Sequence, residues 1–270
     1  MTSTSGSQER SRPVSTAAIV THGRVDVQDA VARVEAVAEG AGVKLVEDPR
    51  EAALVIVLGG DGTMLRTLAK LLGSGVPVLG VNFGRVGFLA SISPDNLERD
   101  LQRVFVGEYV LVELPTIEVR LDGERHVAVN DVVATSSVLG RMVELAWAIG
   151  GEDLGIVPCD GMICATPTGS TAYNLSNGGP VLVRGLDAMA VTFIAPHSLD
   201  ARPLVVPRGL VVTVRNVTPD VPVALLVDGH RVGDLAPGAE VAVYLCEQTS
   251  LLATLPEMTF FARYRETFAS

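Results

Sequence analysis

The feature that most constrains the fold is an apolar run that stops at two glycines. Residues 53–58 read Ala-Leu-Val-Ile-Val-Leu, and Gly59 and Gly60 follow directly. Such a run is typical of a strand buried on both faces, which occurs in parallel sheets covered by helices. Residues 63–72 then have the apolar spacing of a helix. The sequence therefore predicts a strand–turn–helix unit of an open α/β sheet.

Strands and helices are predicted to alternate around this unit as far as residue 110. The strands are expected at 17–20, 43–46 and 76–81, and the helices at 29–39, ending at Gly40, and 94–106. Beyond residue 116 the pattern changes to one helix near 170–176 and short strands at 117–121, 127–134, 142–149, 161–165, 190–194, 204–206, 210–214, 223–227 and 240–245. This predicts an α/β N-terminal domain with an open, mostly parallel sheet, followed by a β-rich C-terminal domain.

The expected domain boundaries follow these changes of pattern. We expect a disordered tail over 1–15, the α/β domain over 16–115 and the β-rich domain over 116–250. The segment 251–270 carries aromatic anchors such as Phe260 and Phe268, and we expect it to pack back on the N-terminal domain.

Charge and composition exclude several classes of protein. The formal net charge is −10 and 48% of the residues are hydrophobic, which suits a folded acidic protein with no nucleic-acid partner. There is neither an apolar run of about 18 residues nor an apolar signal core near the N-terminus, so we expect no membrane association and a cytoplasmic location. The three cysteines and four histidines show no metal-ligand spacing and are interpreted as structural residues.

The sharpest local motif is Gly59-Gly60-Asp61-Gly62-Thr63, at the junction of the apolar strand and the following helix. Ligands of open α/β sheets bind at this edge, and the amides of such a turn can hold phosphate. Asp61 would repel phosphate, but it can face a hydroxyl group or a bound Mg²⁺. The alternative is a simple joint in which Asp61 caps the helix.

Three further segments are candidates for ligand binding. Residues 166–180 are dense in hydroxyl side chains and glycines, and the alternative for them is a solvated turn. Asn130-Asp131 interrupts an apolar strand and needs polar partners, or marks a bulge or a strand-end turn. Asp160-Gly161 precedes the hydroxyl-rich segment, and its alternative is a turn aspartate.

Two common nucleotide-binding motifs are absent. The chain has neither a G-x-x-x-x-G-K-[ST] loop nor a G-x-G-x-x-G fingerprint after a strand. A phosphate site without a loop lysine must use backbone amides, distant arginines and a metal ion. We therefore expect dependence on a divalent cation, with Mg²⁺ as the first choice and no protein ligand to the metal assigned.

Taken together, these segments resemble the NAD kinase family, which uses ATP or inorganic polyphosphate. The resemblance covers nearly the whole chain from residue 16. It rests on the motif 59–63, the glycine segment 82–89, Asn130-Asp131, Asp160-Gly161 with 166–180, and the segments 196–199 and 202–204. The run Thr-Pro-Thr-Gly-Ser-Thr-Ala-Tyr at 166–173 is its most specific part.

The resemblance implies an activity and a set of site residues. The activity is phosphorylation of the adenosine ribose 2′-hydroxyl of NAD, with Asp61 as the general base. The phosphate-donor loop would comprise Gly59, Gly60, Gly62 and Thr63. The NAD-binding residues would be Asp61, Gly62, Arg66, Asn130, Asp131, Arg141, Asp160, Thr171, Ala172, Tyr173, Asn174, Leu175, Ser176, Ala195 and His230. A homodimer or homotetramer is expected.

Two other functions are open to a chain with this loop. A lipid or sphingoid-base kinase has a similar glycine–aspartate loop, but net charge −10 and the absence of a basic amphipathic helix disfavour it. A non-catalytic NAD(P)-binding regulator would bind NAD without producing NADP, and the intact Asp61 motif disfavours it.

Overall fold

The computed structural model describes residues 12–21, 27–83, 87–198 and 200–268. It divides into two compact units, one comprising Met1–Glu113 with Ser250–Ser270 and the other Leu114–Thr249. Most of the predicted tail, residues 1–11, lies outside the described part. Val14 is already buried, and its amide donates to the Phe105 carbonyl at 3.0 Å, so the fold begins before residue 16.

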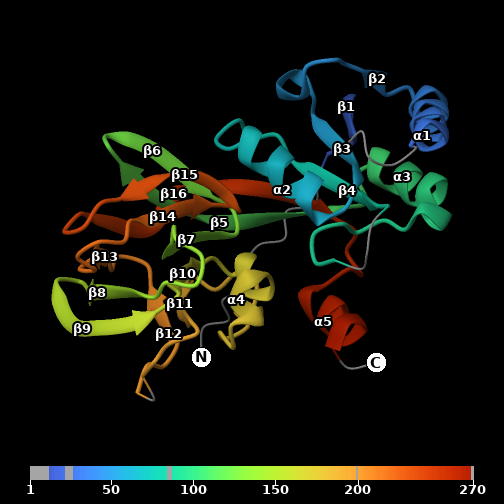
Figure 1. The fold of residues 1–270 in the computed structure, drawn as a ribbon. Coiled ribbons are helices and arrows are strands. Elements are labelled where there is room, and N and C mark those ends of the chain that lie inside the picture. The colour runs from blue at the N-terminus through green and yellow to red at the C-terminus, as the bar shows by residue number, and fades with distance from the viewer. Residues whose placement is uncertain (1–11, 22–26, 84–86, 199, 269–270) are drawn as a thin grey trace. The chain divides into compact units, whose positions relative to one another are not determined.

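The first unit contains a parallel sheet with the order β2-β1-β3-β4, and the last residues of β16 pair in parallel with β4 (Figure 1). The predicted apolar run forms β3, which is buried at every residue and lies between β1 and β4. The strands of this unit are β1 (Thr16–Thr21), β2 (Lys44–Leu45), β3 (Leu54–Gly59) and β4 (Val78–Asn82).

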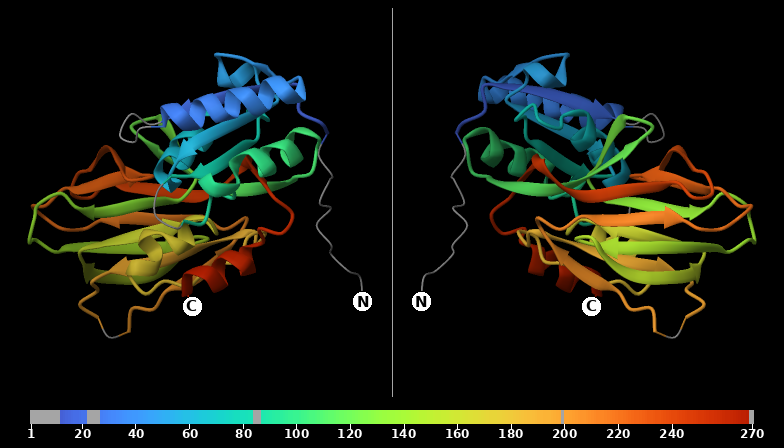
Figure 2. Two further views of the ribbon diagram at one scale, coloured as in Figure 1. Left: turned by 90° about the vertical axis from the view of Figure 1, so that its right-hand side faces the viewer. Right: turned by 90° about the vertical axis from the view of Figure 1, so that its left-hand side faces the viewer.

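Helices cover both faces of this sheet. Alternate side chains of β3, namely Leu54, Ile56 and Leu58, pack in one apolar cluster with α1 and α3, which lie side by side (Figure 2). On α2, Met64 is fully buried and faces Gly80 of β4. The helices are α1 (Gln28–Ala41), α2 (Asp61–Lys70) and α3 (Leu97–Phe105), with the short 3₁₀ turns η1 (Pro49–Glu51) and η2 (Pro94–Asn96). This arrangement confirms the predicted α/β class.

Two predicted helix boundaries in this unit are wrong. The first helix does not stop at Gly40 but continues to Ala41, where Gly42 adopts a left-handed conformation with φ of 71° and ends it. The second helix begins at Asp61 rather than Thr63, with Gly60 as its N-cap residue. The predicted glycine–aspartate loop is therefore the first turn of α2.

The C-terminal segment belongs to the first unit. It comprises the end of β16 (Glu240–Thr254) and the helix α5 (Phe260–Phe268). Glu257 forms an ion pair with Arg103 of α3 at 2.6 Å. The ring of Phe260 lies 6.2 Å from that of Phe88, and Arg263 donates to the Ala90 carbonyl.

The second unit contains two facing β-sheets. In the first sheet β5 pairs with β6 and with β16, and the strand order from there is β16-β13-β8-β9. The second sheet has the order β12-β11-β10-β7-β14-β15. One apolar cluster takes side chains from both sheets, and within it Trp147 meets Phe193 edge-on at 5.2 Å. This confirms the predicted β-rich domain class.

The remaining elements belong to this second unit, with β5 and β16 extending into the first. The strands are β5 (Val110–Leu121), β6 (Glu124–Ala128), β7 (Asp131–Ser136), β8 (Val143–Ile149), β9 (Glu152–Cys159), β10 (Gly161–Ala165), β11 (Ala188–Ile194), β12 (Leu204–Pro207), β13 (Val212–Asn216), β14 (Val223–Val227) and β15 (His230–Leu235). The hydroxyl-rich segment forms the 3₁₀ turn η3 (Gly169–Thr171) and the short helix α4 (Tyr173–Ser176).

Several strand predictions in this part of the chain need correction. The strand β5 begins at Val110 rather than at residue 117, and β16 continues to Thr254 rather than ending at residue 245. The single strand expected at 127–134 is two strands, β6 and β7, which separate at Val129-Asn130. The strands β9 and β15 were not predicted, because both contain glycine and charged residues, and each ends its sheet, where such residues are tolerated.

The three cysteines are buried and unpaired. No helix among the described residues is long and apolar enough to cross a membrane.

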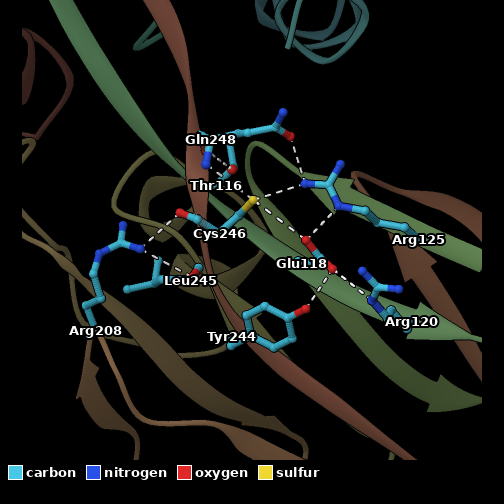
Figure 3. A network of polar contacts seen from close by, with 9 residues as sticks. All are labelled: Thr116, Glu118, Arg120, Arg125, Arg208, Tyr244, Leu245, Cys246 and Gln248. Atoms are coloured by element: carbon cyan, nitrogen blue, oxygen red, sulfur yellow. Dashed lines mark hydrogen bonds and ion pairs between the residues drawn. The ribbon is translucent and has the colours of Figure 1, made fainter. Parts of the chain in front are cut away.

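A polar network joins β5, β6 and β16 (Figure 3). Glu118 is buried and accepts hydrogen bonds from Tyr244 Oη at 2.6 Å, Arg125 Nε at 2.6 Å and Arg120 Nε at 3.0 Å. Arg125 also donates to Cys246 Sγ at 3.1 Å. Burial of the Glu118 carboxyl opposes its ionisation, but the three hydrogen bonds prevail and lower its pKa to about 2.

The Glu118 network makes a prediction about acid stability. Because the pKa is lower in the folded than in the unfolded chain, the stabilisation is complete above about pH 4.5 and is lost as the pH falls towards about 2. We expect Glu118→Gln to be less stable at pH 7 and to lose less stability in this window than the unsubstituted chain. Urea unfolding at several pH values measures both effects. The exposed ion-pair residue Glu240 supplies the control Glu240→Gln, for which a loss below about 1 kcal/mol is expected.

Candidate active site

One candidate site, in the first unit, is the start of α2, where Asp61 is held by backbone amides. Its Oδ2 accepts from the Phe88 amide at 2.8 Å, and its Oδ1 accepts from the Leu89 amide at 3.2 Å. A carboxylate has about four lone-pair positions, so each oxygen can accept one more hydrogen bond. Asp61 is thus fixed in orientation and retains capacity for a ligand.

The approach of residues 87–89 to Asp61 requires glycine at position 87. A Cβ atom on Gly87 would overlap the carboxyl group of Asp61. The sequence singled out the glycine segment 82–89, and the structure brings its described end to Asp61. Residues 84–86 of that segment lie outside the described residues.

The other glycines of the motif have different environments. Gly59 ends β3, and a Cβ there would lie 2.9 Å from Thr63 Oγ1. Among the described residues, a Cβ at Gly62 would meet no atom within 4 Å outside its chain neighbours and its own helix backbone, although alanine would favour the helix by about 1 kcal/mol. The amides of this first helical turn attract anions. Arg66 is exposed and reaches Thr63 Oγ1 at 3.5 Å.

A second candidate site, in the second unit, is the break between β6 and β7. The Asp228 carboxylate accepts from the amides of Val129, Asn130 and Asp131 at 2.9, 2.7 and 3.3 Å. Asp228 and Gly229 form the two-residue turn between β14 and β15, with φ of 48° and 77°. Positive φ at both positions is typical of a type I′ hairpin. This hairpin thus holds the Asn130-Asp131 segment in place.

The hydroxyl-rich segment packs directly on Asn130. The Thr166 amide donates to the Asn130 carbonyl at 2.8 Å, and a Cβ on Gly169 would overlap the same peptide group. Two buried atoms here, Asn130 Oδ1 and Thr168 Oγ1, have no hydrogen-bond partner among the described residues. Buried polar atoms without partners are costly, so a polar ligand at this place would remove the cost.

Asp131 is buried beside these orphaned atoms. Burial raises the pKa of its carboxyl to about 7, and the negative charge of Asp228 adds to the effect. Burial also raises the pKa of Asp228, against the opposing effect of its three backbone hydrogen bonds. This second site therefore contains the buried Asp131, the half-buried Asp228 and one orphaned amide oxygen.

Within 171–176, the side chain of Asn174 is committed to the fold. It is fully buried, donates to the Ser170 and Pro180 carbonyls at 3.0 Å each, and accepts from Thr192 Oγ1 at 2.7 Å. Tyr173 is in contrast 47% exposed. Asn174 thus shapes this short helix, while Tyr173 remains open to solvent.

The other predicted contact residues are placed as follows. Asp160 lies between β9 and β10, where its backbone bonds to Ser136 and Ile194. Ala195 follows β11 with φ of 43°, and His230 begins β15. Arg141 forms an exposed ion pair with Asp220 at 3.0 Å, and no contact in the described chain brings it to Asn130 or Asp131.

Asp228 is a site residue that the sequence analysis missed. The signal was present, because Asp-Gly between two apolar runs is a strong hairpin signal, and it directly precedes His230. Its three hydrogen bonds to a segment 97 to 99 positions earlier could not be read from the sequence. No group of three His, Cys, Asp or Glu side chains in the described chain could hold a metal ion.

Comparison with known proteins assigns both units to one family. The model of the ATP-NAD kinase N-terminal domain matches residues 26–109, and that of the C-terminal domain matches residues 129–255. The chain belongs to the ATP-NAD kinase family. Membership confirms the predicted family, two-domain fold and phosphotransferase class.

Individual relatives agree with this membership. The chain is similar to an NAD kinase of Heliobacterium modesticaldum, 40% identical over 222 residues that cover 80% of this chain and 78% of the relative. It is also similar to the crystal structure of an Archaeoglobus fulgidus NAD kinase in complex with ATP, with a TM-score of 0.79, 26% identity and coverage of 93% and 98%. A yeast NADH kinase complexed with NADH shares the fold, with a TM-score of 0.83, 23% identity and coverage of 95% and 88%.

The contact between Gly87 and Asp61 predicts that Gly87→Ala impairs the reaction more than the fold. The added methyl group must displace either the Asp61 carboxyl or the Phe88 and Leu89 amides. We expect a kcat loss of about 10²-fold, typical of a misplaced catalytic group. Gly40→Ala is the matched control, because a Cβ at Gly40 meets no atom within 4 Å. Steady-state kinetics and thermal unfolding compare the two variants; equal kcat would contradict the prediction.

The raised pKa of Asp131 predicts that its contribution to the free energy of unfolding changes with pH in the opposite direction to that of Glu118. Between about pH 4 and 7 the folded chain keeps this proton while the unfolded chain releases it, so stability falls as the pH rises. We expect Asp131→Asn to remove this fall, which has a limiting slope of about 1.4 kcal/mol per pH unit. The exposed Asp95 supplies the control Asp95→Asn. Identical pH profiles of unfolding free energy for Asp131→Asn and the unsubstituted chain would refute the assignment.

Proposed function

We propose that this chain transfers the terminal phosphoryl group of ATP to the 2′-hydroxyl of the adenosine ribose of NAD, which yields NADP. The observation that carries the proposal is the oriented Asp61 carboxylate beside the first-turn amides of α2. A carboxylate can accept the hydroxyl proton, and adjacent amides can hold phosphate oxygens. The family membership and the ATP complex of the archaeal relative support the same reaction.

Asp61 acts in this proposal as the general base. The transition state of phosphoryl transfer is loose, so the base orients the hydroxyl and takes its proton late. Each Asp61 oxygen accepts one backbone amide and retains capacity for a further hydrogen bond. No described side chain lies within 4 Å of a Cβ built on Gly62, and we propose that the ligand approaches the backbone there. We assign the donor phosphates to Gly59, Gly60, Gly62 and Thr63.

We assign NAD binding chiefly to the buried acceptors of the second unit. Asn130 Oδ1 has no hydrogen-bond donor among the described residues, and Asp131, the next residue in the chain, is buried. Ribose hydroxyls are donors that match both groups. We keep as further NAD contacts Arg66, Arg141, Asp160, Thr171, Ala172, Tyr173, Asn174, Leu175, Ser176, Ala195 and His230.

A divalent cation, Mg²⁺ by preference, completes the proposed reaction. Mg²⁺ at kinase sites is held by one or two carboxylates together with substrate phosphates, and Asp61 is the carboxylate available at the start of α2. When bound, the cation neutralises the charge of the donor phosphates. Inorganic polyphosphate is proposed as an alternative donor. We also propose a cytoplasmic location and a homodimeric or homotetrameric assembly.

The test is NADP formation from NAD with Mg²⁺, run in parallel with ATP and with polyphosphate. An NADP-specific dehydrogenase detects the product. We expect product that disappears on addition of a chelator, and a loss of about 10²–10⁴-fold in kcat for Asp61→Asn with NAD binding retained. Near-normal kcat in Asp61→Asn would show that Asp61 is not the base.

Two negative results would overturn the proposal in different ways. Binding of NAD without product from either donor would indicate a non-catalytic regulator. Failure to bind NAD at all would favour the lipid-kinase alternative.

A further inference from the structure

The C-terminal helix α5 stands apart from the other helices of the first unit. It lies away from the sheet that α1, α2 and α3 cover (Figure 1), and none of its residues is fully buried. It has nine residues, and isolated helices of this length are marginal in water. The helix therefore depends on the few contacts that it makes. Those contacts include residues 88 and 90, in the loop that binds Asp61.

The aromatic residues of α5 pack on Phe88. Phe260, Tyr264 and Phe268 follow one another at intervals of four residues and so share one side of the helix. The ring of Phe88 lies 6.2 Å from that of Phe260 and 5.7 Å from that of Phe268. Tyr264 completes the cluster, with its ring 5.0 Å from that of Phe268. Favourable aromatic pairs have ring centroids about 4.5–7 Å apart, so Phe88 is held from both ends of α5.

Arg263 lies on the same side of the helix and binds the next part of the loop. Its side chain is only 11% exposed, although it is charged. Nη2 of the guanidinium donates to the Ala90 carbonyl, and Nη1 donates to Glu266 at 3.1 Å. Burial of a charged group is costly unless hydrogen bonds satisfy it. These two contacts therefore fix where the guanidinium lies and tie Ala90 to the helix.

The loop that α5 contacts needs such support. Residues 87–91 belong to no helix or strand. Their downstream end is tied to β4, because the amides of Ser91 and Ile92 donate to the Gly80 carbonyl at 3.1 Å each. Two of the residues before this anchor donate their amides to Asp61. The contacts of α5 thus fall on the part of the loop that orients Asp61.

The chain that leads into α5 is itself anchored on the first unit. Leu255 is buried in the apolar cluster that includes α1 and α3. Glu257 pairs with Arg103 of α3 at 2.6 Å. The Thr259 hydroxyl then accepts from the Ala262 amide at 3.1 Å, as a residue that caps the start of a helix does. The helix can therefore impose a fixed position on the loop.

We propose that α5 is a positioning element for the general base, with Arg263 and Phe268 as its principal positioning residues. This inference rests on the proposed function, in which Asp61 accepts the hydroxyl proton. The ring of Phe88 and the carbonyl of Ala90 are held by α5, and the two amides that bind Asp61 belong to this short stretch. Displacement of a catalytic group by about 1 Å can cost about 10²-fold in rate. A helix that contacts only the loop can therefore control kcat.

The test compares two pairs of variants of the full chain. Arg263→Gln removes the guanidinium from the loop, and its control Arg265→Gln removes the same charge from an exposed side chain of the same helix. Phe268→Ala removes one ring from Phe88. Its control is Phe261→Ala, which removes a ring that is 66% exposed from the same helix.

Two measurements are made on each variant. The first is hydrogen exchange of the backbone amides of residues 88 and 89, without NAD or a phosphate donor. The second is steady-state kinetics of NADP formation. We expect Arg263→Gln and Phe268→Ala to exchange about tenfold faster or more, since one lost hydrogen bond to a charged group is worth about one power of ten. Their kcat should fall by about 10- to 100-fold at nearly unchanged KM for NAD, and the controls should keep all values.

A double-mutant cycle distinguishes positioning of Asp61 from a general effect on the fold. In the Asp61→Asn background, Arg263→Gln should lower the single-turnover rate by less than about twofold, because the base that it positions is gone. A full further loss in that background would overturn the proposal, since α5 would then act on another part of the reaction.

Two other results would also overturn the inference. One is exchange at residues 88 and 89 that is the same in both variants as in their controls. The other is faster exchange with unchanged kcat in a chain that makes NADP. Exchange is measured without turnover, so it remains informative if the chain has no activity. Faster exchange in a chain that makes no NADP from either donor would refute the proposed function while supporting the hold of α5 on the loop.

Discussion

Two aspartate carboxylates that accept hydrogen bonds from backbone amides hold the candidate sites, one in each unit. Asp61 binds the amides of residues 88 and 89, and Asp228 binds those of residues 129–131. Both bound segments lie between regular elements, where amides have no strand or helix partner and would be costly to bury unpaired. One charged side chain satisfies several amides at once. Each carboxylate therefore fixes a ligand-facing segment that secondary structure alone would leave unsupported.

The apolar framework explains how these carboxylates reach their positions. The strand β3 is buried on both faces and ends where α2 begins, so Asp61 projects from the carboxyl edge of the sheet. In the second unit, β7 pairs with β14 throughout, and the β14–β15 turn brings Asp228 to the start of β7. Packing thus determines strand order, and strand order brings acids to amides distant in sequence.

The fold class, the central strand β3 and the family motifs could be predicted because each depends on a pattern in contiguous residues. Apolar periodicity identified β3 and its helix, and the density of glycine and hydroxyl residues marked 59–63 and 166–180. The errors fell where local signals conflict with the tertiary environment. Strand β9 contains Gly155 and Pro158, and β15 contains Gly233, so both resemble loops in sequence. In sequence, Asn130-Asp131 resembles part of a strand. The break after β6 could not be predicted there, because the Asp228 carboxylate that binds its amides lies 97 to 99 positions later in the chain.

The sequence by itself determined the architecture and the family, because buried parallel strands and glycine-rich turns leave patterns in contiguous residues. Only the tertiary structure decided that Asp61 is held by residues 88 and 89 and that Asp228 organises the Asn130-Asp131 break. These properties depend on distances between residues far apart in the chain and on which charges find partners. Neither the distances nor the pairings follow from local periodicity, since they arise when the sheets and helices pack.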